Sequence, residues 1–122
     1  MHALLVPEIN SLKRNILELK KLKRAMLHEQ VKANKIKGKE KREQKDTTKL
    51  IGIRSVVGQH LADAEREADE AQQSLSAISG IMERERIRLK PSERRIIFGL
   101  KQERADTIAT CKTIHADVYT DK

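Results

Sequence analysis

The fold is decided by residues 50–89, which read LIGIRSVVGQHLADAEREADEAQQSLSAISGIMERERIRL. This is the longest part of the chain with an unbroken helical apolar pattern, in which apolar residues recur at alternating steps of four and three: Val57, Leu61, Ala64, Ala68, Ala71, Leu75, Ile78 and Met82. That spacing places all of them on one narrow stripe of an α-helix, the geometry by which helices pack against each other. Acidic residues flank the middle of the stripe: Asp63, Glu65, Glu67, Asp69 and Glu70. The stretch therefore predicts a helix that requires a partner helix, preferably a basic one.

The composition of the 122-residue chain indicates an elongated all-α protein. Apolar residues make up 38% of the chain and charged residues 36%, against roughly 45–50% and about 25% in typical domains. Phe98 and Tyr119 are the only aromatic residues, although compact cores take much of their buried area from aromatic side chains. Thin helical layers, in which each helix buries only a stripe, need less apolar material. We therefore expect a single helical domain over residues 1–122.

The formal net charge of +8 is distributed unevenly. Residues 8–54 contain 15 Lys or Arg and 6 Asp or Glu, a net charge of +9. Residues 55–85 contain 2 Lys or Arg and 7 Asp or Glu, a net charge of −5. Residues 86–122 contain 9 Lys or Arg and 5 Asp or Glu, a net charge of +4. The charge pattern predicts a basic helix, then an acidic helix, then a mildly basic one.

The chain divides into three predicted helices, over residues 8–45, 48–89 and 92–118. Pro7 suits the first turn of the first helix, and Asp46, Thr47 and Thr48 are the best cap and turn signal before the second. The run 32–45 is almost entirely charged or polar and contains Gly38, so a disordered linker is the alternative to a solvated helical extension there. Pro91 disfavours helix in the residue before it and separates the second and third helices.

A reversal of the chain near Thr47 predicts an antiparallel, coiled-coil-like hairpin. This turn places Leu12 opposite Met82, Ile16 opposite Ile78, Leu19 opposite Leu75, and Met26 opposite Ala68. It also brings Arg24 near Glu70 and Lys32 near Asp63, so that charge selects the register while apolar burial supplies the energy.

The third helix matches the second less well, with Leu100 near Gly80, Ile108 near Gln72 and Val118 near Ala62. Two architectures are therefore compatible with the sequence: an elongated three-helix bundle, and an open hairpin from which the third helix diverges. In the open form, the apolar face of residues 96–118 must be covered by another subunit or protein. The predicted packing seam comprises Leu12, Ile16, Leu19, Met26, Val57, Leu61, Ala64, Ala68, Ala71, Leu75, Ile78, Met82, Ile97, Leu100, Ile108 and Cys111.

No motif in the sequence supports catalysis, a metal site, a cofactor or a small-molecule substrate. His28, His60 and His115 are isolated from one another, and no HExxH, CxxC or glycine-rich phosphate loop is present. The register could bring the three histidines into one half of the bundle near Cys111, but boundary histidines and a small buried cysteine are the usual outcome. We therefore expect a protein that is not an enzyme and that has no catalytic, cofactor-binding or metal-binding residues.

Two basic clusters at the bends are the candidate contacts for phosphates or for an acidic protein partner. The first comprises Lys32, Lys35, Lys37, Lys39, Lys41, Arg42, Lys45 and Lys49; the second comprises Arg84, Arg86, Arg88, Lys90, Arg94 and Arg95. Such cations can neutralise several phosphates without reading sequence. No aromatic residue is interleaved, which argues against stacking on single strands. The alternative is a solvated tip whose charge keeps a narrow protein soluble.

The single cysteine cannot form an intramolecular disulfide, which favours a reducing compartment. No apolar run reaches the 18 or more residues of a membrane span, and residues 3–6 are too short for a signal-peptide core. We expect a cytoplasmic protein, or a component of a particle assembled in the cytoplasm.

Two functional hypotheses follow. The first is a structural, assembly or adaptor protein that docks by its apolar stripes in an oligomer or larger complex, as scaffold, stalk and phage-particle proteins do. The alternative is a nucleic-acid-binding accessory protein whose basic bends contact phosphates non-specifically.

Overall fold

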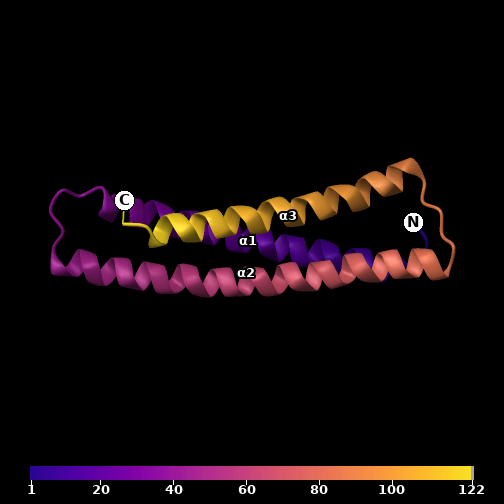
Figure 1. Cartoon of the computed structure of the whole chain (residues 1–122), viewed down its shortest axis with the longest axis horizontal. Helices are drawn as coiled ribbons and strands as arrows, with labels where there is room; N and C mark the ends of the chain where they lie inside the picture. Colours follow the sequence, from indigo (N-terminus) through magenta and orange to yellow (C-terminus); the bar gives the residue numbers. More distant parts are fainter. Residues whose placement is uncertain (122) are drawn as a thin grey trace.

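The computed structural model describes residues 1–121 and contains three long helices that pack side by side (Figure 1). They are α1 (Val6–Lys37), α2 (Gln44–Arg84) and α3 (Pro91–Tyr119). The predicted all-α fold is confirmed: α1 and α2 form an antiparallel hairpin, and α3 returns alongside both. With 41 residues, α2 is about 60 Å long and spans the whole rod.

The first bend lies earlier in the chain than the sequence suggested. Helix α1 ends at Lys37 rather than near residue 45, and Gly38 donates its backbone N–H to the Asn34 carbonyl at 2.9 Å. Ile36 is the last buried residue of α1, so the charged residues beyond it have no apolar surface to pack against. The turn is therefore formed by residues 38–43, and Thr47, where the reversal was predicted, lies inside α2.

Asp46 caps the start of α2. Its Oδ2 accepts the backbone N–H of Glu43 at 3.1 Å, and its Oδ1 accepts Lys39 Nζ at 2.9 Å. These two contacts hold the α1–α2 turn against the first turn of α2. The hydrogen bond from Lys39 and that from the Glu43 backbone lower the pKa of Asp46 below its usual value of 3.8.

The second bend depends on an unusual backbone conformation at Arg86. Helix α2 ends at Arg84 rather than near residue 89, and the N–H of Ile87 returns to the Met82 carbonyl at 2.9 Å. This is the Schellman arrangement, which places the residue after the cap in the left-handed region and usually selects glycine there. Arg86 occupies that position with φ of 50°.

The observed register differs from the predicted one. Asn15 Nδ2 donates to Glu67 Oε2 at 2.7 Å and to Glu70 Oε2 at 2.9 Å, whereas the predicted pairing places Asn15 opposite Ser79. The partners therefore lie 9 to 12 residues earlier in α2, about three helical turns. The predicted pairing of Leu19 with Leu75 is wrong, because these residues belong to different apolar clusters. The shift follows from the earlier turn.

The ion pairs predicted across the hairpin also differ from those observed. Lys32 Nζ pairs with Glu29 on its own helix at 3.3 Å, and Asp63 pairs with Arg66 at 3.2 Å. Both pairs connect residues three positions apart on an exposed helix surface, where a pair contributes a few tenths of a kcal/mol. The polar contacts that join α1 and α2 in this register are instead the hydrogen bonds from the buried Asn15 amide to the carboxylates of Glu67 and Glu70.

The core is divided into two apolar clusters along the rod. One extends from the α1–α2 turn to the middle of the rod and contains Leu19, Met26, Ala33, Ile36, Leu50, Ile53, Val57, Ala64, Ala68, Cys111, Ile114 and Val118. The other occupies the opposite half and contains Leu5, Ile9, Leu12, Ile16, Ala71, Leu75 and Ile78. All the predicted seam residues are buried except Leu61, Met82, Ile97, Leu100 and Ile108, which are half-buried.

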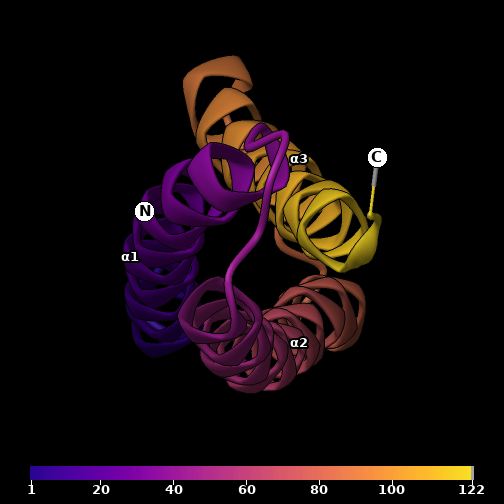
Figure 2. The same ribbon diagram turned by 90° about the vertical axis from the view of Figure 1, so that its left-hand side faces the viewer.

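Helix α3 closes the bundle at one end and leaves it open at the other. Its C-terminal half buries Thr107, Cys111, Ile114 and Val118, whereas Ile96 and Phe98 in its N-terminal half are 46% and 66% exposed. Figures 1 and 2 show this N-terminal half diverging from α2. We call the end with residues 38–43 the loop end and the end with residues 85–90 the open end.

Three hydrogen bonds set the position of α3 on α2. Arg104 Nε donates to the Ala68 carbonyl at 2.7 Å, Tyr119 Oη donates to the Arg54 carbonyl at 2.7 Å, and Arg54 Nε donates to the Val118 carbonyl at 3.0 Å. The predicted pairing placed Ser76 opposite Arg104, so this register is displaced by eight residues, about two turns.

Replacing Asn15 by alanine should destabilise the hairpin, because it removes both hydrogen bonds to the Glu67 and Glu70 carboxylates. The matched control is Asn10→Ala, an exposed position in the same helix with the same change in helix propensity. We expect Asn15→Ala to be about 1–3 kcal/mol less stable than Asn10→Ala in urea unfolding followed by circular dichroism. Equal stability of the two variants would contradict a role for Asn15 in holding the register.

The stability of the chain should depend on the ionisation of Asp46. Because the pKa of Asp46 is lowered in the folded state, its carboxylate stabilises the fold above pH about 4, and this contribution is lost as pH falls through the lowered value. The wild type should therefore be more stable than Asp46→Asn at pH 7, and the two should converge towards pH 2. Thermal unfolding across this range measures the difference; a gap that stays constant with pH would exclude this ionisation.

Candidate functional site

A groove with a volume of about 700 Å³ lies between α2 and the diverging half of α3. Its apolar side chains come from both helices and from the connection between them: Leu75, Ile78, Met82, Leu89, Ile97 and Phe98. Its polar borders are formed by Gln72, Ser76, Ser79, Glu83, Arg94 and Lys101. The groove lies where α3 diverges from α2 and no longer covers it.

Phe98 marks the groove as incompletely covered. It is the most exposed of the large apolar residues, and Ile96 beside it is also exposed. Burying such a side chain stabilises a protein by about 1.5–3 kcal/mol, and this chain leaves that stabilisation unused at Phe98. An apolar face with this geometry suits another helix, which would complete the packing that α3 starts.

The surroundings of the groove are strongly basic. Residues 83–101 contain seven Lys or Arg and three Glu, a net charge of +4. Within residues 1–121, no ion pair involves Arg84, Arg86, Arg88, Arg94 or Arg95. The groove is therefore apolar at its floor and positive around its open end.

The acidic Glu93 at this end is already occupied. Its Oε1 accepts the Lys90 backbone N–H at 3.0 Å, and its Oε2 pairs with the amino group of Met1 at 3.3 Å. These contacts, the first of them foremost, lower the pKa of Glu93 and keep it ionised. Because the Glu93 carboxylate already pairs with the positive amino group of Met1 and caps α3, it neutralises little of the arginine charge.

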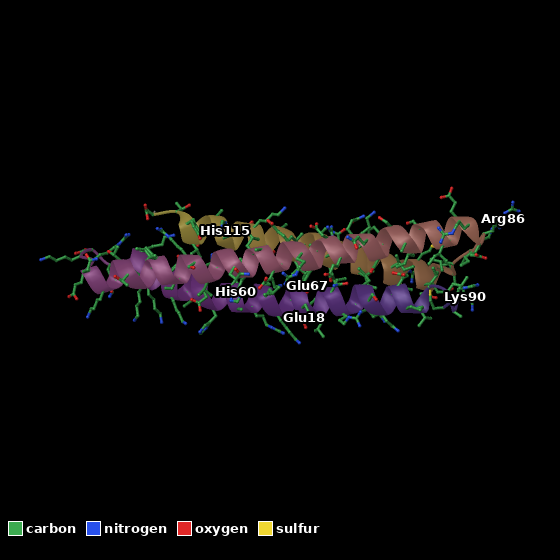
Figure 3. All side chains as sticks on the ribbon, turned by 90° about the horizontal axis from the view of Figure 1, so that it is seen from below. Glu18, His60, Glu67, Arg86, Lys90 and His115 are labelled. Atoms are coloured by element: carbon green, nitrogen blue, oxygen red, sulfur yellow. The ribbon has the colours of Figure 1, made fainter. Side chains whose placement is uncertain are left out.

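The predicted basic clusters lie at opposite ends of the rod. Figure 3 shows Arg86 and Lys90 at the open end, whereas the first cluster surrounds residues 38–43 at the loop end. The structure brings members of each cluster together, but it does not bring the two clusters together. The length of α2 prevents one small ligand from contacting both.

The cations of the loop end fall into three groups. Three of them have acidic partners, since Lys32 pairs with Glu29, Lys39 with Asp46, and Lys45 with Glu43. Lys37 Nζ instead donates to the Asp117 carbonyl at 2.6 Å and so helps to hold the end of α3. Four exposed cations have no ion pair within residues 1–121: Lys35, Lys41, Arg42 and Lys49.

The histidines and the cysteine occupy ordinary structural positions. His28 is exposed, and His60 and His115 are half-buried in the loop-end half of the rod (Figure 3). His115 stacks on Tyr119 with ring centroids 4.4 Å apart. Cys111 is fully buried, and this burial raises the pKa of its thiol. Among residues 1–121, no group of three or more His, Cys, Asp or Glu side chains has a metal-binding arrangement.

Several contacts that shape the site were missed by sequence reasoning. Arg104 interrupts the apolar side of α3 in the sequence, yet its side chain reaches across to α2. Gln30 Nε2 donates to Asp117 Oδ2 at 2.7 Å, which joins α1 to the end of α3. Ile96 and Phe98 flank the seam residue Ile97 in the sequence and so widen the apolar side of α3, which is the sequence signal for the groove.

Comparison of this chain with protein families, curated proteins and solved structures finds no match. Within the part of the chain that the structure describes, none of the helices is long and apolar enough to cross a lipid bilayer. The fold and the groove define a class rather than a particular protein: an elongated three-helix bundle with one uncovered apolar face.

Arg86→Gly should stabilise the protein. A non-glycine residue in the left-handed region, such as Arg86, costs about 1–2 kcal/mol, and glycine removes this cost. Glycine also gives the unfolded chain more conformational freedom, which offsets part of the gain in stability. We expect the free energy of unfolding to rise by about 0.5–1 kcal/mol in urea denaturation. The control Glu85→Gly changes the neighbouring residue, whose φ is −93°, and should not stabilise. A loss of stability in Arg86→Gly would contradict this account of the bend.

Proposed function

We propose that this chain is a non-enzymatic assembly or adaptor protein that docks an amphipathic, acidic helix of a protein partner in the groove at the open end. The observation that carries this proposal is the apolar floor of the groove, which continues onto the exposed Phe98. A partner helix that lies there covers the faces that α2 and α3 leave uncovered and completes a local four-helix arrangement.

Charge complementarity favours an acidic partner. The groove is bordered by Arg94 and Lys101 and lies beside the arginines of the second bend. Acidic residues on either side of the partner's apolar stripe would meet these cations, which steers association and fixes orientation. A second copy of this chain fits less well, because docking two open ends together would bring two arginine-rich bends into contact. Self-association is therefore a possible outcome of the test, and the partner helix is the proposal.

The rod shape is consistent with a role in a larger structure. Scaffold, adaptor, stalk and phage-particle proteins commonly use long helical rods to hold other components apart, an analogy at the level of the fold. We place the protein in the cytoplasm or in a particle assembled there, because its one cysteine is a buried thiol.

A designed peptide tests the groove directly. The probe is an 18-residue amphipathic helix with leucines on one stripe and glutamates on both flanks; the control peptide has lysines in place of the glutamates. We expect fluorescence anisotropy to show binding of the glutamate peptide, at micromolar concentration, and none of the lysine peptide. Phe98→Ala should weaken binding about 10–100-fold, the equivalent of burying one large apolar side chain.

The matched control variant is Ile51→Ala. Ile51 is 63% exposed, close to the 66% of Phe98, but it lies on α2 near the loop end. It should bind the glutamate peptide as the wild type does. Equal weakening in both variants, or equal binding of both peptides, would contradict the proposed site. A stable oligomer in light scattering that Phe98→Ala dissociates would assign the groove to a second copy instead.

A further inference from the structure

We infer that the loop end binds the phosphate backbone of duplex nucleic acid. This inference goes beyond the adaptor function and does not depend on it, because the loop end and the groove are at opposite ends of α2. The ligand is a polyanion that is contacted by charge alone, without reading of bases.

Two adjacent hollows give the loop end its shape. One, of about 410 Å³, lies between α1 and α2 and is lined by Lys35, Lys39 and Lys49 among others. The second, of about 550 Å³, lies over the start of α2 and shares Lys39, Asp46 and Lys49 with the first. The hollows therefore form one continuous surface on which lysines from α1, from the turn and from α2 converge.

The cations of the loop end, which are those of the hollows together with Lys41 and Arg42 in the turn beside them, exceed its acids. Glu29 in the first hollow is matched by Lys32, Asp46 by Lys39 and Glu43 by Lys45. Asp121 nearby is matched by Arg54 at 2.8 Å. Glu40 in the turn is the remaining acid of residues 35–49, which carry seven Lys or Arg and three acids. The four cations without an ion pair within residues 1–121 outnumber it, and the positive end of the α2 dipole adds to them. The net field at the loop end attracts anions.

The distribution of these cations favours an extended ligand over a single phosphate. Lys35, Lys41, Arg42 and Lys49 belong to three different segments and are all exposed, so they suit successive phosphates of a polymer. A single strand is disfavoured, because binding without sequence preference there relies on aromatic stacking. The Tyr119 ring already stacks on His115, with the Arg54 guanidinium 5.9 Å from its centroid. A membrane surface is disfavoured because Ile36 and Ile53, the apolar residues of the first hollow, are buried and cannot insert.

The open end suits this ligand less well despite its arginines. There the cations lie beside the exposed Phe98 and Ile96. A bound phosphate backbone would not bury these two apolar side chains. At the loop end, the apolar residues that line the hollows, Ile36 and Ile53, are buried, so a phosphate backbone bound over the hollows covers no exposed apolar side chain of their lining. The two basic clusters thus differ in what they can recognise.

A salt-titrated binding assay tests the inference. The probe is a fluorescently labelled 20-base-pair DNA duplex of arbitrary sequence, and the triple variant Lys41→Gln, Arg42→Gln, Lys49→Gln removes three cations that hold no ion pair in the described chain. The wild type should bind with a slope of log K against log salt of about −3 to −4. The triple variant should lose about three units of that slope and at least tenfold in affinity at about 50 mM salt. Thermal unfolding should be unchanged.

The matched control is the triple variant Lys13→Gln, Arg24→Gln, Lys112→Gln. It also removes two lysines and one arginine, lowering the net charge equally, from exposed positions along the rod. Retained binding by this control supports the site; equal weakening in both triple variants would show that net charge alone binds the duplex and would overturn it. An RNA duplex should bind comparably, since both present a phosphodiester backbone. Absence of duplex binding at about 50 mM salt, or binding to phosphatidylserine vesicles in place of the duplex, would also overturn the inference.

Discussion

The close contact of α1 and α3 with the small residues of α2 is the constraint on which the structure depends. Ala64, Ala68 and Ala71 are almost fully buried, and Arg104 reaches the Ala68 backbone from α3 at 2.7 Å. The small side chains at these positions leave the Ala68 carbonyl within reach of the Arg104 side chain. The bundle is closed where these residues lie, and α3 diverges where the larger Leu75, Ile78 and Met82 follow. The alanines thus lie in the middle of the rod, and Leu50, Ile53 and Val57 continue the closed half to the loop end, in one apolar cluster with Ile114 and Val118 of α3.

A repeating apolar stripe leaves the register of a helical hairpin undetermined. Because three helical turns correspond to about 11 residues, the stripes of α1 and α2 still face each other after a shift of that size. This is the shift between the predicted and the observed pairing. A polar residue in the seam removes the degeneracy, as single polar residues do in coiled coils. Asn15 is that residue, since Glu67 and Glu70 together accept both of its amide donors in the observed register.

The faces of the helices and both ends of α3 could be predicted from the sequence, whereas the helix ends at the first bend and the end of α2 could not. Periodicity identifies buried positions locally, and the seam on α2 contains the residues that the pattern indicates. The end of α1 depends instead on Gly38 and on a lack of packing after Ile36, which polar residues with good helix propensity conceal. The loop-end contact between Lys39 and Asp46 joins residues seven apart through a turn whose conformation follows from tertiary packing. The groove was foreseen only as one of two alternatives, because the course of α3 depends on its contacts with both other helices.

The rod also explains why two kinds of surface can exist on so small a chain. Burial of the stripes consumes most of the large apolar side chains, and Phe98, the most exposed of those that remain, lies where α3 diverges. The lysines after the last packed turn of α1 lie in a segment without buried apolar residues, and they cluster in and around the exposed residues 38–43. At physiological ionic strength, charge interactions decay over about 8 Å, far less than the length of α2 of about 60 Å. Charges at one end of α2 are therefore screened from the other, so the two proposed ligands, an acidic helix in the groove and a phosphate backbone at the loop end, would bind independently of each other.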